Sequence, residues 1–182
     1  MRISALFCRS QEFRKTLETS RPRLYRVAYA WTHDASLADY LVQETLTKAW
    51  QKHEQLRDDK AQEAWLFSIL TNCFRDNFRR YRETDDIDEM ELASDQNIEA
   101  EHIQSELIGR IRSAIGRLPT GQRQVVTLVD LEGFSYIEVS SILGVPCGTV
   151  MSRLCRARAT LKNALLTELE APVPEKRIRR VK

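Results

Sequence analysis

Apolar residues return every three or four positions through most of this chain, and no segment alternates apolar and polar residues as a half-buried strand would. No glycine occurs before Gly109, and the only earlier proline, Pro22, suits the first turn of a helix because its missing N–H costs little there. The pattern therefore predicts four helices, at residues 10–19, 21–32, from a cap at Asp34 or Ser36 to 52, and 60–82. Four such helices can bury one compact core.

The pattern fades after residue 82 and returns near residue 98. It then predicts helices at 98–118 and 121–131, a short helix that stops at Gly144, and a last helix that ends before Pro172. Ser135, three residues before Glu138, predicts a capping box at the start of the short helix, in which each side chain bonds the other residue's backbone N–H.

The last helix has two chemically different faces. One is an apolar stripe of Val150, Leu154, Ala157, Leu161 and Leu165. The other carries hydroxyl and guanidinium groups, which bind phosphates and base edges, from Thr149, Ser152, Arg153 and Arg156. Because a short helix and a tight glycine turn precede this face, the sequence predicts a DNA-binding helix-turn-helix. The alternative is a surface helix with solvated arginines.

Charge is unevenly distributed, although the formal net charge is only +2. Residues 83–109 carry ten acidic side chains and neither Lys nor Arg, so the flanking segments are both basic. Two basic blocks of this kind are expected if each of them binds a polyanion. The weakly periodic part of the acidic strip, 83–96, would reach roughly 45 Å if extended, which exceeds about 34 Å for one turn of duplex DNA. Two modules so joined can contact separate sites on one duplex.

The sequence also argues against several function classes. No stretch approaches the length of a membrane span and the N-terminus is too briefly apolar for a secretory signal, so a cytoplasmic protein is expected. Cys8, Cys73, Cys147 and Cys155 lack zinc-site spacing, which predicts reduced, packed thiols and no bound metal. No phosphate-loop, metalloprotease or dinucleotide motif occurs, so neither an enzyme nor a cofactor is expected.

Three segments together resemble extracytoplasmic-function (ECF) sigma factors of the sigma-70 family. WTHDASLADYLVQETLTKAW is similar to the segment of region 2 that docks on core RNA polymerase, and AWLFSILTNCFRDNFRR to the segment that opens and reads the minus-ten element. LPTGQRQVVTLVDLEGFSYIEVSSILGVPCGTVMSRLCRARATLKNAL is similar to the promoter-reading region 4. The resemblance implies an all-α protein with a four-helix region 2 at 8–82, an acidic flexible linker at 83–97, a helix-turn-helix region 4 at 98–170 and a basic tail at 171–182.

The same resemblance assigns residue roles. It implies contacts with the β′ clamp helices of the polymerase for Asp39, Leu41, Val42, Gln43 and Glu44. The β flap of the polymerase is implied as a further partner of the chain. For minus-ten DNA, it implies that Asn72 contacts a flipped base and that Arg75, Asn77, Arg79 and Arg80 belong to the same site. Minus-thirty-five contacts are implied for Arg123, Ser135, Tyr136, Thr149, Ser152, Arg153 and Arg156. An anti-sigma factor is implied as a further partner, without membrane insertion.

Two alternatives remain open from the sequence. A plain helix-turn-helix regulator would need neither the LVQE segment nor the aromatic and basic stretch at 65–82. A helical enzyme or scaffold would leave the two basic blocks unexplained. The chain also departs from the family pattern at Tyr40, where an acid is usual, at Ser140, where alanine is usual, and at Met151, where lysine is frequent. The last departure removes a cation beside the DNA groove.

Overall fold

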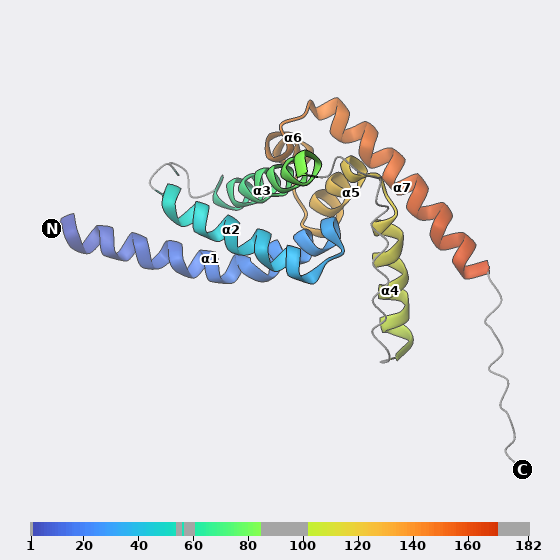
Figure 1. Cartoon of the computed structure of the whole chain (residues 1–182), viewed down its shortest axis with the longest axis horizontal. Coiled ribbons are helices and arrows are strands. Elements are labelled where there is room, and N and C mark those ends of the chain that lie inside the picture. Colours follow the sequence, from blue (N-terminus) through green and yellow to red (C-terminus); the bar gives the residue numbers. More distant parts are fainter. Residues whose placement is uncertain (1, 54–55, 57–60, 85–101, 171–182) are drawn as a thin grey trace, which may run out of the picture.

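The computed structural model describes the backbone of residues 2–53, 56, 61–84 and 102–170, and the side chains of residues 11–53, 56, 61–80 and 108–166. Every regular element in these ranges is a helix (Figure 1), so the predicted all-α class is confirmed. The predicted tail at 171–182 lies outside the described residues, as does the predicted linker at 83–97 except for its first two residues, which end a helix. None of the described helices is both long and apolar enough to cross a bilayer.

The first helix, α1 (Arg2–Thr32), runs without interruption through Pro22. The prediction of two helices here was wrong, because side chains on both sides of the proline are buried in the same core. Leu17 is only 7% exposed and Leu24 is fully buried. An interior proline costs a helix about 3 kcal/mol, and burial of each large apolar side chain contributes about 1.5–3 kcal/mol in the opposite direction. The N-terminal unit therefore has three helices in its described part instead of four.

The other two helices of the N-terminal unit are α2 (Ala35–Lys52) and α3 (Gln62–Thr84). Asp34 caps α2, since its carboxylate accepts a hydrogen bond from the Leu37 N–H at 3.0 Å. Both helices lie against α1 (Figure 1). The apolar positions of their predicted core faces are fully buried at Leu41, Val42, Leu66 and Leu70.

The C-terminal unit consists of α4 (His102–Gly116), α5 (Thr120–Val126), η3 (Thr127–Leu131), α6 (Tyr136–Leu143) and α7 (Cys147–Glu170). The α-helix predicted at 121–131 was only half correct, because its second half is the π-helical segment η3. There, the Glu132 N–H reaches back five residues to the Thr127 carbonyl at 3.1 Å. A π turn depends on tertiary contacts that periodicity does not report, and such turns are frequent at functional sites.

The predicted helix-turn-helix is confirmed in α6 and α7. Ser135 and Glu138 form the expected capping box, and Gly144 ends α6 with φ of 61°, a conformation that favours glycine. Val150, Leu154 and Ala157, the first part of the apolar stripe of α7, are buried. Side chains of this stripe hold α7 against α5 and α6, and the opposite face is left for other contacts.

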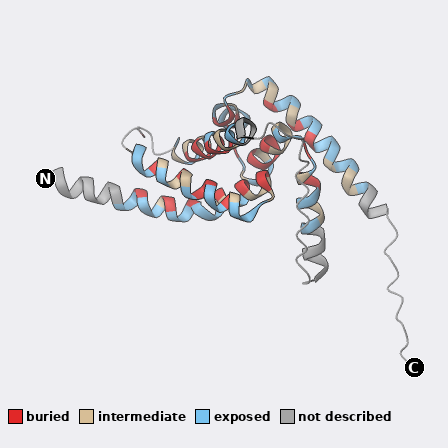
Figure 2. Cartoon of the chain, viewed as in Figure 1, coloured by how far each residue is buried: buried red, intermediate tan, exposed pale blue. Residues whose placement is uncertain are grey.

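The two units do not stand apart, as two modules on a linker would; they pack on each other and share one hydrophobic core (Figure 2). The Phe67 ring of α3 meets the edge of Phe134, which precedes α6, with ring centroids 5.0 Å apart. The indole N–H of Trp31 in α1 donates to the Thr127 hydroxyl of η3 at 2.8 Å. We call this interface between α1–α3 and α4–α7 the interdomain seam.

Candidate nucleic-acid interface

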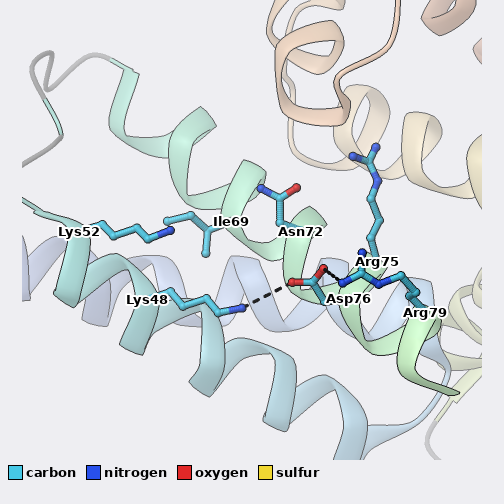
Figure 3. A pocket seen from close by; sticks show the side chains of 7 residues that line it. All are labelled: Lys48, Lys52, Ile69, Asn72, Arg75, Asp76 and Arg79. Carbon is cyan, nitrogen blue, oxygen red and sulfur yellow. Dashed lines mark ion pairs between the residues drawn. The ribbon is translucent and has the colours of Figure 1, made fainter. Parts of the chain in front are cut away.

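A basic hollow of about 470 Å³ lies on the surface of the N-terminal unit, between α2 and α3 (Figure 3). Its walls combine an amide, one apolar side chain, one acid and four cations, contributed by Lys48, Lys52, Ile69, Asn72, Arg75, Asp76 and Arg79. Three of the predicted minus-ten residues, Asn72, Arg75 and Arg79, therefore lie together. An amide offers both a donor and an acceptor, and the cations give the hollow a positive potential that attracts phosphate.

The sequence analysis missed the two lysines of this hollow. Lys48 and Lys52 are four residues apart, so they lie on one face of α2 beside the buried stripe. That spacing was the available signal, but only the packing of α2 on α3 brings this face next to Asn72. The hollow is thus built by two helices, whereas the resemblance assigned minus-ten contacts to α3 alone.

Ion pairs hold one of the two lysines that line this hollow. The Lys48 ammonium lies 2.9 Å from a Glu44 carboxylate oxygen and 3.9 Å from an oxygen of Asp76, whose other oxygen is 3.9 Å from Arg79. The hydrogen bond with Glu44 raises the pKa of Lys48, so this side chain is charged at neutral pH. Partly exposed pairs like these add little to stability, and their main effect is to orient the ammonium beside the hollow.

The remaining predicted minus-ten residues differ in their surroundings. Arg79 and Arg80 are exposed, and Asn77 is half-buried on the same helix. The guanidinium of Arg75 reaches toward the C-terminal unit. There it donates a hydrogen bond to the backbone carbonyl of Leu143, the last residue of α6. In this structure the interdomain seam holds the Arg75 guanidinium, and its contact with minus-ten DNA stays a prediction.

The predicted polymerase-binding residues fall into two groups on α2. Asp39 and Gln43 are exposed, and Glu44 is half-buried through its pair with Lys48. Leu41 and Val42 are fully buried in the core, which corrects their assignment as contact residues. A side chain without accessible surface cannot touch a partner, so these two support the helix on which the polar residues are displayed.

The recognition face of α7 carries the four predicted side chains. Ser152 and Arg156 are exposed, and Thr149 is half-buried. Arg156 lies along its own helix, where its Nε donates to the Ser152 carbonyl at 3.2 Å. Arg153 is half-buried because its guanidinium lies over Gly121 at the start of α5, and a Cβ at that glycine would come within about 3.0 Å of it.

Arg123 was assigned to minus-thirty-five DNA, and the structure half-buries it in the interdomain seam. Its guanidinium donates to the carbonyl of Trp31 in α1 at 2.7 Å and to that of Leu118 at 3.1 Å. Burial lowers the pKa of Arg123. Both hydrogen bonds go to backbone carbonyls, and the contact of Arg123 with minus-thirty-five DNA stays a prediction.

The predicted residues of α6 have structural roles as well. The Ser135 hydroxyl accepts a hydrogen bond from the Glu138 N–H at 3.3 Å, and Glu138 in turn accepts from the Ser135 N–H at 2.8 Å. Tyr136 follows at the first position of α6 and is 37% exposed. The Ser135 side chain is thus used for capping, and the exposed ring of Tyr136 lies at the same end of the helix.

The capping box predicts a pH-dependent contribution to stability. Hydrogen bonds from the Ser135 hydroxyl and N–H lower the pKa of Glu138 from its ordinary value of 4.5. A lowered pKa stabilises the fold above the unfolded pKa, and this contribution is lost as the pH falls through the folded pKa. Urea unfolding should therefore find Glu138→Gln less stable than wild type at pH 7. The difference should shrink below about pH 4.5, and a constant difference at all pH values would contradict the assignment.

The cysteines were expected to be packed thiols, and this is confirmed only for Cys73, which is buried. Cys147 is half-buried and Cys155 is exposed on α7, and none of these three forms a disulfide. The side chain of Cys8 lies outside the described residues. Within the described side chains, no group of three or more His, Cys, Asp or Glu is arranged to hold a metal ion.

Comparison with known proteins matches both units. Residues 16–84 fit the profile of Sigma-70 region 2, and residues 108–161 fit that of Sigma-70, region 4. The chain is 36% identical over 150 residues to the ECF RNA polymerase sigma factor EcfG of Rhodopseudomonas palustris (strain TIE-1), covering 81% of each chain.

The solved structures that are similar to this one include two protein complexes. The sigma factor RpoE in complex with the anti-sigma factor NepR from Bartonella quintana gives a TM-score of 0.72 at 28% identity, over 87% of this chain and 99% of that chain. CnrH in complex with the cytosolic domain of CnrY gives a TM-score of 0.65 at 26% identity, over 87% and 90%. Since both units match in order and in fold, the chain belongs to the extracytoplasmic-function sigma factors, which direct RNA polymerase to promoters.

Proposed function

We propose that this sigma factor docks on core RNA polymerase through the exposed polar side chains of α2 and reads a promoter at two separate places. The observation that carries this proposal is the basic hollow, in which Asn72 lies among cations from two helices. A plain helix-turn-helix regulator has no need of such a hollow outside its helix-turn-helix. The β′ clamp helices are the proposed docking partner of Asp39, Gln43 and Glu44, and the β flap that of the C-terminal unit.

In the minus-ten element, the hollow would accept a nucleotide that has left the duplex. The Asn72 amide can pair with the edge of an unstacked base, and Ile69 offers that base an apolar surface. Lys48, Lys52 and Arg79 would contact the flanking phosphates, as a positively charged groove does for single strands. Opening of the promoter then comes from capture of unstacked bases, without any step of bond chemistry.

In the minus-thirty-five element, α7 would enter the major groove with Ser152, Arg153 and Arg156 directed toward base edges and phosphates. A further proposed partner is an anti-sigma factor, since the structures of RpoE and CnrH were each solved with a second protein, which for RpoE is named an anti-sigma factor. The proposed site of action is the cytoplasm, where bacterial polymerase meets promoters.

Reconstitution with core RNA polymerase tests this function directly. The full chain and core enzyme should elute together in gel filtration, and the complex should start transcription at defined sites on genomic DNA in a run-off assay. Asp39→Asn combined with Gln43→Ala should weaken coelution, whereas Lys15→Gln, on the exposed surface of α1, should not. Separate elution of wild type and core at micromolar concentration would contradict the sigma function and favour a plain DNA-binding regulator.

The salt dependence of binding tests the two lysines of the hollow. Each phosphate contact to a single strand contributes about 0.7 to the slope of log affinity against log salt concentration. With the holoenzyme and a single-stranded minus-ten oligonucleotide from the run-off promoters, Lys48→Gln and Lys52→Gln should each reduce that slope by about 0.7. The matched Lys15→Gln variant should keep the wild-type slope. Unchanged slopes in both hollow variants would remove α2 from the DNA site.

A further inference from the structure

Two sulfur-containing side chains lie one helical turn apart on the exposed surface of α7. Met151 is 53% exposed, and Cys155, four residues further on, is exposed as well and forms no disulfide. Residues four apart share one face of a helix, so the two side chains form an uncharged apolar strip, which we call the sulfur strip. By helical spacing, Ser152 lies between this strip and Arg156. The strip therefore belongs to the outward half of α7, opposite the buried stripe.

The polar side chains of this outward half are bonded along the helix itself. The Ser152 hydroxyl donates to the carbonyl of Thr149 at 3.1 Å, and a guanidinium nitrogen of Arg156 lies 3.4 Å from the same hydroxyl. Arg153 is half-buried over Gly121. Met151 has no group that could take part in such bonds, and its side chain stays exposed in the second turn of α7, where a recognition helix contacts base edges.

The major groove offers one apolar group to such a side chain. Among the base pairs, only those with thymine present a methyl group there, and proteins read it through apolar contact. The lysine that is frequent at position 151 in the resembling family would donate hydrogen bonds to guanine or phosphate. Methionine has no donor, and its flexible thioether packs against irregular apolar surfaces. The exchange of a cation for Met151 therefore changes which base this position can recognise.

We infer that Met151 is a specificity-determining residue that reads the 5-methyl group of a thymine in the minus-thirty-five element. Cys155 extends the same apolar surface toward the neighbouring base pair. This inference rests on the proposed function, in which α7 enters the major groove, and it specifies an A·T pair at the position that faces Met151. DNA is the favoured occupant of the sulfur strip because the strip shares the outward half of α7 with Ser152 and Arg156.

Replacement of thymine by deoxyuridine tests this contact, since deoxyuridine lacks only the 5-methyl group. The probes are duplexes that span the minus-thirty-five element of promoters defined by run-off transcription, with one thymine replaced at a time on either strand. Binding is measured with the full chain in complex with core polymerase. One replacement should weaken binding by wild type about fourfold, the effect expected for one buried methyl group. The others should leave the affinity unchanged.

Met151→Ala should remove the effect of that one replacement, because the shorter side chain no longer reaches the methyl group. Met151 is exposed and alanine is the better helix former, so the fold should be kept. The variant should bind the unmodified duplex at least about fourfold more weakly than wild type. It should bind the thymine and deoxyuridine duplexes equally well. This double-mutant cycle joins one side chain to one methyl group.

Leu166→Ala is the matched control, since Leu166 is an apolar side chain of the same helix, 46% exposed and about four turns further along. It should keep the full deoxyuridine effect. Met151→Lys should lose that effect as Met151→Ala does. Its new cation should also make the salt dependence of duplex binding steeper, by about 0.9 if it contacts a phosphate.

The outcomes separate this inference from the proposed function. A wild-type chain whose affinity changes with no deoxyuridine replacement would overturn the methyl contact. So would a replacement that weakens wild type and Met151→Ala equally. If Met151→Ala instead reduced coelution with core polymerase, the sulfur strip would be a protein contact. In each case, transcription from the same promoters by wild type would leave the sigma function intact, and only its failure there would contradict that function.

Discussion

Trp31→Ala should lower the free energy of unfolding by about 3–5 kcal/mol, the usual range for removing a buried tryptophan or phenylalanine side chain. Trp31 is 1% exposed, and its ring meets the edge of Phe74 with centroids 5.3 Å apart. Its indole N–H also bonds Thr127 across the interdomain seam at 2.8 Å. The substitution therefore removes packing inside the N-terminal unit and a link to the C-terminal unit at once. Urea unfolding followed by far-ultraviolet circular dichroism measures the loss.

Trp31→Phe separates these two contributions. Phenylalanine keeps an aromatic ring against Phe74 and loses the N–H, so the expected cost is about 1 kcal/mol for the hydrogen bond plus a smaller packing loss. Thr127 would keep partners, because its hydroxyl also lies within hydrogen-bond distance of the carbonyls of Arg123 and Gln124. Equal destabilisation by Trp31→Phe and Trp31→Ala would contradict the view that packing dominates at this position.

Asn72→Ala should impair promoter opening strongly while leaving polymerase binding intact. A side chain that pairs with a base edge contributes about 1–3 kcal/mol of discrimination, which corresponds to roughly 5-fold to 150-fold in open-complex formation. Asn72 is exposed, and alanine is the better helix former, so the fold should not be weakened. Permanganate reactivity of thymines in the promoter measures opening, and gel filtration with core enzyme measures docking.

Asn163→Ala provides the same substitution on α7, far along the chain from the hollow, and should open promoters as wild type does. If Asn72→Ala gave wild-type permanganate reactivity, Asn72 would not be the base reader. Loss of both opening and polymerase binding would instead indicate that α3 had been disturbed. The combination of lost opening and retained docking is specific to a residue that binds the separated strand.

Local signals in the sequence determined most of the secondary structure. Asp34 and the Ser135–Glu138 pair satisfy backbone groups within their own turns, so their capping roles follow from short-range chemistry. Gly144 ends α6 because its left-handed backbone is a local requirement. Pro22 shows where local signals were insufficient, since burial of its neighbours, decided by the whole core, keeps α1 continuous.

Side-chain roles were predicted less completely, because a helical pattern does not say which neighbour covers each face. Leu41 and Val42 lie within the motif that suggested polymerase contacts, but both side chains are buried in the core. Lys48 and Lys52 joined the minus-ten hollow only through the packing of α2 on α3. The sequence of the predicted linker did not indicate how the two units are arranged. The contacts that join the units come from residues far apart in the chain.

The sequence by itself determined that this protein is helical, carries a helix-turn-helix and resembles the sigma factors, because capping, periodicity and motif order are properties of neighbouring residues. Only the tertiary structure decided that the two units share a core, that two lysines of α2 belong to the hollow around Asn72, and that Arg75 and Arg123 cap helices across the seam. The physical reason is that a guanidinium binds a phosphate and a helix C-terminus through the same N–H groups. Which of these it meets depends on long-range packing.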